Sequence, residues 1–204
     1  YGPDSSNDSA NWRRDANRIL ALHREYGVDY FKLDAVKLAN KQCEEHFRSL
    51  IHAVLEETAG KVTFDLDVTA GLRPGYFALP EAGPIFVENR YTDLHRYWPH
   101  QTLRNLWKLS HYVDPLRLRM EFLNPTRNRE IYQGDPLAPS RYREDYLFAS
   151  TMFANPLGWF ETSGLSEVSI QNIAAVAKIW KDERAAIFSG TILPIGETPD
   201  GASW

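Results

Sequence analysis

The sequence alternates, from one end to the other, between segments with the pattern of β-strands and segments with the pattern of α-helices. Strands are predicted at residues 28–35, 61–69, 84–89, 116–123 and 157–161. Helices, with apolar residues at helical spacing, are predicted at residues 8–27, 41–60, 99–113, 140–155 and 168–187. Strands that alternate with helices favour parallel βα units, because two parallel strands need a crossover connection, which is usually a helix. The predicted fold class is therefore α/β.

Length and charge limit the kind of protein. The 204 residues, of which 43% are hydrophobic and 25% charged, suit one globular domain. The net charge of −4, with acids and bases interspersed, predicts neither a nucleic-acid partner nor a basic patch for a membrane surface. No run of about 18 apolar residues predicts a transmembrane helix. Cys43 is the only cysteine, which excludes an internal disulfide and a cysteine-rich metal site.

Each predicted strand has an acidic residue near its C-terminal end. The acids are Asp34, Asp65, Asp67, Glu88, Glu121 and Glu161. In the first strand, Tyr30, Lys32 and Asp34 share one face, because alternate side chains of a strand point the same way. An exposed edge strand would explain one such polar face. It does not explain why all five strands have an acid near their C-terminal end, whereas a barrel does, since catalytic groups gather at the C-terminal ends of barrel strands.

The predicted architecture is thus part of a (β/α)8 barrel, strands four to eight with their helices. The sequence begins with Tyr1, and we expect it to be a fragment in which earlier strands are missing. The localisation consequently stays open. An open doubly wound sheet is the alternative, although no glycine-rich GxGxxG turn follows any predicted strand.

The segment "DYFKLD", residues 29–34, resembles the nucleophile strand of the melibiase-type α-galactosidases, glycoside hydrolase family 36 in clan D. Members carry an aromatic-x-Lys-x-Asp pattern at the end of barrel strand four. The resemblance implies that Asp34 is the covalent nucleophile and that Lys32 contacts sugar hydroxyls. It extends over most of the chain in strand order. The tail "ILPIGETPDGASW" resembles the lead-in to a C-terminal β-sandwich, so the expected domains are a barrel part at 1–185 and a β-domain or linker at 186–204.

The acid/base of this family lies on strand six, which corresponds here to "IFVENRYTD", residues 85–93. The family pattern is Trp-x-Ser-Asp followed by Thr-Asp. Aligning the second pair with Thr92 and Asp93 puts Arg90 where the acid belongs, and an arginine cannot donate a proton near neutral pH. Glu88, held at the strand end, is the preferred acid/base, and Asp93 is the alternative.

The expected activity is retaining hydrolysis of terminal α-glycosidic bonds, in particular α-galactosidic ones, by double displacement without a cofactor or metal. The substrate would be a glycoside or oligosaccharide, and the full-length enzyme could form a homo-oligomer. The expected substrate-binding residues are Lys32, Asp65, Asp67, Arg73, Arg90, Glu121 and Trp159. Two alternatives stay open: a metal-dependent barrel lyase or hydrolase, in which Asp65 and Asp67 would supply oxygen ligands, and a non-catalytic carbohydrate-binding fragment. Which sugar and linkage are cleaved is not determined by the sequence.

Overall fold

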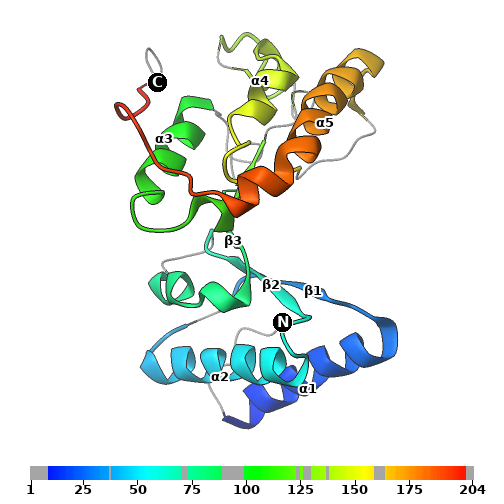
Figure 1. Ribbon diagram of the computed structural model, residues 1–204, viewed down its shortest axis with the longest axis vertical. Helices are drawn as coiled ribbons and strands as arrows, with labels where there is room; N and C mark the ends of the chain where they lie inside the picture. Colours follow the sequence, from blue (N-terminus) through cyan, green and yellow to red (C-terminus); the bar gives the residue numbers. More distant parts are fainter. Residues whose placement is uncertain are drawn as a thin grey trace. The chain divides into compact units, whose positions relative to one another are not determined.

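The computed structural model describes residues 9–36, 38–69, 73–88, 99–122, 125, 130–136, 138–158 and 164–200. It is an α/β protein, as the sequence predicts (Figure 1). The chain divides into two compact units, Tyr1–Phe86 and Val87–Trp204. No helix in the described ranges is both long and apolar enough to cross a membrane.

The strands are short and follow one another in the sheet in chain order. They are β1 (Tyr30–Leu33), β2 (Thr63–Asp67), β3 (Ile85–Glu88), β4 (Leu118–Glu121) and β5 (Asn155–Leu157). The described pairings, β1 with β2, β2 with β3 and β4 with β5, are all parallel. This parallel sheet with intervening helices is compatible with part of a (β/α)8 barrel.

In the first unit, two helices cover one face of the strands (Figure 1). They are α1 (Ser9–Tyr26) and α2 (Lys41–Glu57). Asn40 is the N-cap of α2, and its side chain accepts a hydrogen bond from the Cys43 backbone N–H at 2.9 Å. Two 3₁₀ helices, η1 (Pro74–Ala78) and η2 (Pro80–Ala82), lie between β2 and β3. The core forms because the apolar sides of α1 and α2 meet the alternate side chains Phe64 and Leu66 of β2, which are fully buried.

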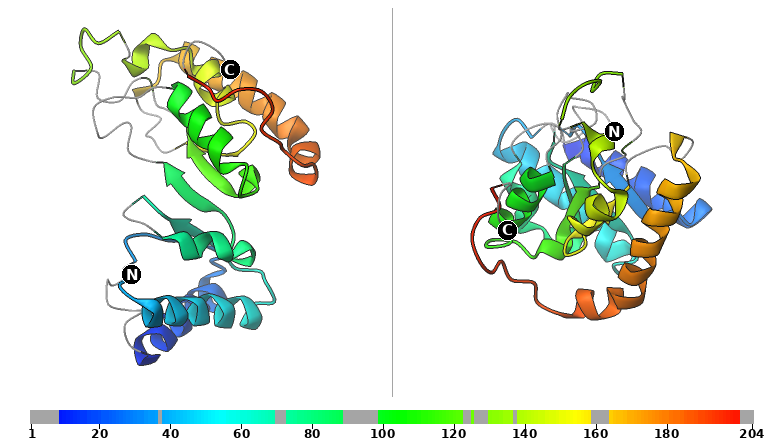
Figure 2. Two further views of the ribbon diagram at one scale, coloured as in Figure 1. Left: turned by 90° about the vertical axis from the view of Figure 1, so that its left-hand side faces the viewer. Right: turned by 90° about the horizontal axis from the view of Figure 1, so that it is seen from above.

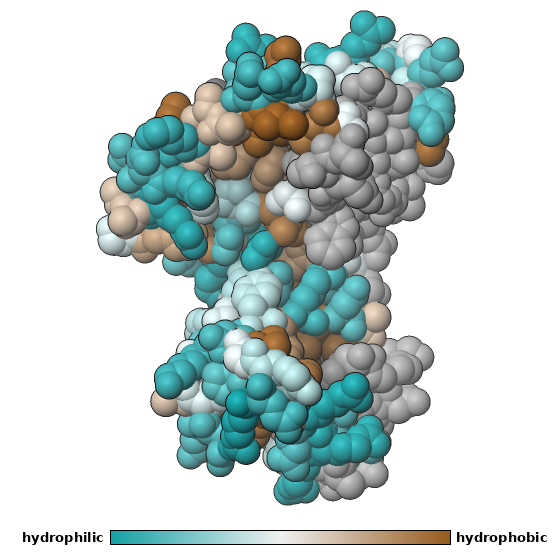
Figure 3. Space-filling model, turned by 90° about the vertical axis from the view of Figure 1, so that its right-hand side faces the viewer, coloured by the Kyte–Doolittle hydropathy of each residue, from teal (hydrophilic) through white to brown (hydrophobic). Residues whose placement is uncertain are grey.

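The second unit contains α3 (Pro99–Leu109), α4 (Glu144–Ala149) and α5 (Glu167–Ser189), with 3₁₀ helices η3 (Pro115–Arg117) and η4 (Pro139–Arg141) (Figure 2). Helices α4 and α5 pack against each other. The Phe148 and Trp180 rings meet edge to face at 6.3 Å, and the Glu144 carboxylate accepts hydrogen bonds from Ser169 and Asn172 at the start of α5. On the face shown in Figure 3, hydrophobic residues of this unit gather at the surface among hydrophilic ones.

The predicted helix at 140–155 is wrong in its length. Helix α4 spans only Glu144–Ala149, and β5 already begins at Asn155. The hydroxyls of Ser150 and Thr151 donate back to the carbonyls of Leu147 and Phe148 at 2.7 and 2.9 Å. Such side-chain bonds compete with the helical ladder and end the helix there.

The C-terminal part of the chain bears on two further expectations. Helix α5 runs continuously across residues 185 and 186, where the two expected domains meet. Residues 190–200 contain no strand, and the last four residues of the chain lie outside the described ranges. The β-sandwich segment is therefore not confirmed and stays a prediction.

Candidate active site

A polar face lies at the C-terminal ends of β1 and β2. The register pairs Lys32 with Asp65, so the side chains of both lie on the same face of the sheet. The Lys32 ammonium donates a hydrogen bond to Asp67 Oδ2 at 2.8 Å, and the Tyr30 hydroxyl donates to Asp65 Oδ2 at 2.7 Å. Groups from two neighbouring strands are therefore joined through their side chains.

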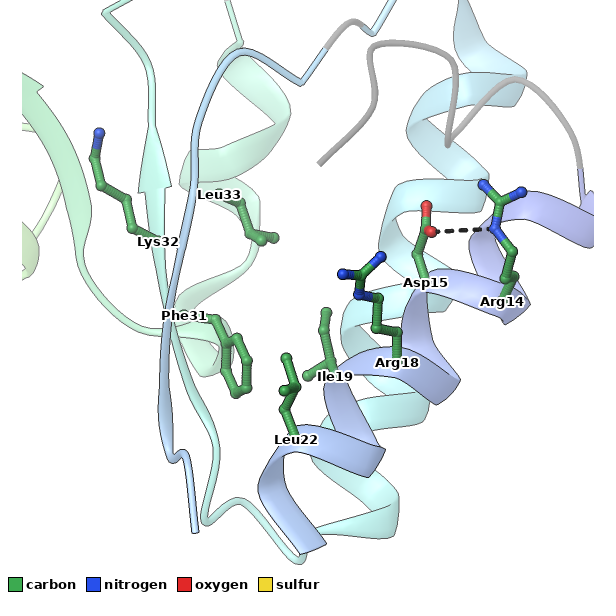
Figure 4. Close-up of a pocket in the computed structure, with 8 residues that line it drawn as sticks. All are labelled: Arg14, Asp15, Arg18, Ile19, Leu22, Phe31, Lys32 and Leu33. Atoms are coloured by element: carbon green, nitrogen blue, oxygen red, sulfur yellow. Dashed lines mark ion pairs between the residues drawn. The ribbon is translucent and has the colours of Figure 1, made fainter. Parts of the chain in front are cut away.

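The opposite face of β1 is apolar and packs toward α1. Figure 4 shows Phe31 and Leu33 directed to the helix side of the strand, while the Lys32 ammonium points away from it. A cavity of about 640 Å³ lies there, lined mainly by residues of α1 together with Phe31 and Leu33. Of the described residues of the polar face, Lys32 lines this cavity, whereas Asp34, Asp65 and Asp67 do not.

Asp67 is the most deeply buried acid of the polar face. Its side chain has no exposed surface and accepts hydrogen bonds from the Thr69 backbone N–H at 2.7 Å and from the Thr69 hydroxyl at 2.6 Å, in addition to the bond from Lys32. Burial by itself would raise the pKa of Asp67, but these hydrogen bonds together outweigh burial, so the pKa is below its ordinary value of 3.8. Asp67 is therefore a fixed negative charge at neutral pH.

Asp34 follows the last residue of β1 and is the exposed acid of the group. Its carboxylate forms an ion pair with the Lys32 ammonium at 3.4 Å, and 60% of its side chain is accessible to solvent. Lys32 therefore contacts two carboxylates, one buried and one open. Its ammonium also lies 4.5 Å from the centre of the Phe86 ring on β3, which is a favourable cation–π contact.

Arg73 lies between β2 and η1 and is buried. Its guanidinium donates two hydrogen bonds to the carbonyl of Val36, from Nε at 2.9 Å and from Nη2 at 2.5 Å. Val36 belongs to the turn after β1, in which Ala35 has a φ of 53°. This left-handed conformation costs a non-glycine residue about 1–2 kcal/mol.

The remaining residues expected at the site are Glu88, Arg90, Asp93, Glu121 and Trp159. Glu121 is the last residue of β4 in the second unit and is buried. Glu88 ends β3, but its side chain lies outside the described part of the structure. Arg90, Asp93 and Trp159 also fall outside the described residues. Of the residues expected from the sequence, the structure thus brings together Lys32, Asp34, Asp65 and Asp67 on the polar face. Arg73 lies in the same unit and contacts the turn after Asp34 through Val36.

Three contributors to the site were not assigned to it from the sequence. Tyr30 lies two residues before Lys32 on the same strand, so the alternation of side chains along the strand already placed it on the same face. Thr69 lies two residues after Asp67, the spacing at which an aspartate side chain accepts a bond from the backbone N–H. Phe86 could not be found this way, because its contact with Lys32 depends on the register between separate strands.

Chemically, the arrangement offers an exposed carboxylate beside a cation that is itself held by a buried carboxylate. A carboxylate in this position can act as a nucleophile or base, and the ammonium and acid oxygens can bind hydroxyl groups. Within the described ranges, no three His, Cys, Asp or Glu side chains are grouped so that they could hold a metal ion.

No family model matches the chain, and neither the curated proteins nor the solved structures include a significantly similar one.

Proposed function

We propose that the protein is a retaining glycoside hydrolase of the α-galactosidase type, and that its strands are strands four to eight of a (β/α)8 barrel. The observation that carries this proposal is the Lys32 ammonium between the exposed Asp34 carboxylate and the buried Asp67 carboxylate, at the C-terminal ends of adjacent parallel strands. Catalytic groups of barrel enzymes come from this end of the strands. The aromatic-x-Lys-x-Asp pattern of residues 30–34 supports the same assignment.

In the proposed reaction, the Asp34 carboxylate attacks the anomeric carbon of the sugar as the bond from this carbon to the leaving oxygen breaks. An acid donates a proton to that oxygen, which leaves as an alcohol. The residue that donated this proton then removes a proton from a water molecule. The water hydrolyses the glycosyl ester and regenerates Asp34. Both steps invert the anomeric carbon, so the net stereochemistry is retained.

Lys32 and Asp67 would act as a fixed pair in this reaction. The Lys32 ammonium carries donors for sugar hydroxyls, and its bond to Asp67 limits the rotamers available to its long side chain. Asp65, held by the Tyr30 hydroxyl, offers acceptor oxygens on the same face. Glu88 is the proposed acid/base, with Asp93 as the alternative.

Chemical rescue tests the nucleophile. Asp34→Gly should reduce hydrolysis of p-nitrophenyl α-galactoside to near background, and sodium azide should restore part of it by forming a glycosyl azide in the vacated space. Asp34→Asn removes the same charge without opening that space, so azide should restore far less activity. Asp29→Asn, one residue before β1, is the matched control and should stay active.

Three results would contradict the proposal. One is an unmodified protein that cleaves no α-galactoside, α-glucoside or N-acetyl-α-galactosaminide. The second is an Asp34→Gly variant that is as active as the unmodified protein. The third is activity that a chelator abolishes and a divalent cation restores, which would favour a metal-dependent hydrolase instead.

A further inference from the structure

The turn after β1 is held in a conformation that its own sequence does not favour. Ala35 has a φ of 53°, a left-handed value that residues with a Cβ adopt uncommonly because the Cβ crowds the following carbonyl oxygen. Ala35 directly follows Asp34, so its backbone conformation sets the direction in which the chain leaves the proposed nucleophile. Contacts from elsewhere in the fold must stabilise this turn.

Arg73 supplies such a contact. Two guanidinium nitrogens donate to the single carbonyl oxygen of Val36, at 2.9 and 2.5 Å. Arg73 is only 8% exposed and Val36 only 1%, so water competes little for these bonds. Hydrogen bonds from a charged donor are stronger than neutral ones, and the planar guanidinium gives them a fixed direction.

Asp34 therefore lies between two anchored residues. On one side, Lys32 belongs to β1 and is held by Asp67 and by the Phe86 ring. On the other side, the Val36 carbonyl is held by Arg73. The Asp34 side chain itself is exposed, and its contact with Lys32, at 3.4 Å, is longer than the bond between Lys32 and Asp67. Its position thus depends on the backbone at both ends.

We infer that Arg73 is a positioning residue for Asp34, which holds the turn of residues 34–36 through the Val36 carbonyl and so keeps the Asp34 carboxylate beside the Lys32 ammonium. This inference rests on the proposed function for the role of Asp34. It assigns Arg73 to the turn, whereas the sequence pattern assigned it to the substrate. The two assignments differ in one respect that can be measured. If Arg73 holds the strained turn, a substitution at Ala35 that removes the strain should reduce the effect of losing Arg73.

A double-mutant cycle between Arg73 and Ala35 tests this inference. Arg73→Met keeps the buried stem and removes the donors, and it should lower kcat for p-nitrophenyl α-galactoside about 10- to 100-fold, the size of effect that a misplaced reacting group causes. The KM should change less than about threefold. Ala35→Gly lets the turn adopt a positive φ without strain, so in the Arg73→Met background it should restore kcat at least about tenfold. Arg48→Met, an exposed position on α2, is the matched control.

Hydrogen exchange provides a readout that does not require activity. Arg73→Met should speed amide exchange in residues 34–38, adding Ala35→Gly should slow it again, and Arg48→Met should leave it unchanged. If the unmodified protein proves inactive on glycosides, the proposed function fails while this measurement still tests the turn. If Arg73→Met does not fold, Arg73→Lys, which keeps the positive charge but has a single donor nitrogen, takes its place with a smaller loss.

Two outcomes would overturn the inference. One is a loss of activity in Arg73→Met that appears mainly in KM and that Ala35→Gly does not reduce, which is the behaviour of a substrate contact. The other is unchanged exchange across residues 34–38 in a folded Arg73 variant, because the guanidinium would then not hold the turn.

Discussion

At Asp67, burial and hydrogen bonding shift the pKa in opposite directions, and hydrogen bonding has the larger total effect. Burial opposes the charge, whereas Lys32 and Thr69 stabilise it, so the pKa in the folded protein is below the ordinary value of 3.8. A carboxyl with a lowered pKa stabilises the folded state above its unfolded pKa, and this contribution is lost as the pH falls through the folded pKa. The polar face should therefore weaken in acid below about pH 4.

Asp67→Asn should lower the free energy of unfolding at pH 7 by about 2 kcal/mol, because the Lys32 ammonium loses its shortest charged partner. The difference from the unmodified protein should begin to shrink as the pH falls below about 3.8, where Asp67 of the unfolded chain becomes protonated, and should be lost as the pH falls through the lower pKa of the folded protein. Urea unfolding at pH 7 and pH 3 measures both. Asp182→Asn breaks an exposed pair with Lys178 and should cost at most about 0.5 kcal/mol. An equal cost of Asp67→Asn at both pH values would show that its charge does not stabilise the fold.

The choice between Glu88 and Asp93 can be settled by leaving groups. In the proposed mechanism, the acid assists departure of a poor leaving group about 10²- to 10⁴-fold and contributes little for an activated aryl glycoside. Glu88→Gln should therefore slow cleavage of an alkyl or oligosaccharide α-galactoside far more than that of the p-nitrophenyl glycoside. If this dependence follows Asp93→Asn instead, Asp93 is the acid/base, and the assignment of Asp34 is unaffected.

Among the elements, the entry into β3 depends on a close approach of two backbones. Gly83 has a φ of 132°, and a Cβ at this position would lie 2.4 Å from the carbonyl oxygen of Phe64 on β2. Gly83→Ala should therefore lower the free energy of unfolding by about 3 kcal/mol, since strain and a backbone clash combine. Gly60→Ala is the matched control: its φ is also positive, but nothing lies within 4 Å, so about 1 kcal/mol is expected. Thermal unfolding of both variants measures these losses. Equal losses of unfolding free energy would show that the backbone shifts enough to accommodate the added Cβ at residue 83.

The same elements show what the sequence can predict. Strand parity on β1 correctly separated Lys32 from Phe31, because one face packs on α1 and α2 while the other carries charges. Order and type of the elements follow from periodicity, which is a local property. The end of α4 and the start of β5 did not follow, because they depend on pairing with β4 and on hydroxyl bonds to nearby carbonyls. The contact between Arg73 and the Val36 carbonyl could not be predicted either, since the two residues are 37 positions apart in the sequence.

At the scale of the whole molecule, helix α5 carries exposed apolar side chains along its length. Val168, Ala175, Ile179 and Ala186 recur at intervals of seven, four and seven residues and are all exposed, so they form one apolar stripe along the helix. Exposed apolar patches promote association between chains.

Ile179→Lys should therefore reduce self-association, because it places a charge in the middle of this stripe. Light scattering after size-exclusion chromatography, over a range of protein concentrations, measures the effect. Lys181→Gln, which lies on the same helix and is exposed, is the control. If the unmodified protein stays monomeric at high concentration, the stripe does not cause association.

Sheet order that equals chain order has a consequence for synthesis of the protein. Each strand from β2 to β5 neighbours the strand made just before it, so a growing chain meets each partner as soon as both have left the ribosome. Contacts of short sequence separation form quickly. The apolar cluster that α1 and α2 form with β1 and β2 reaches no further than Ala82 among the described residues, so we expect it to resist protease on stalled ribosomes before the second unit has been translated. Nascent chains that stay sensitive until the full length is released would show that folding waits for the C-terminal half.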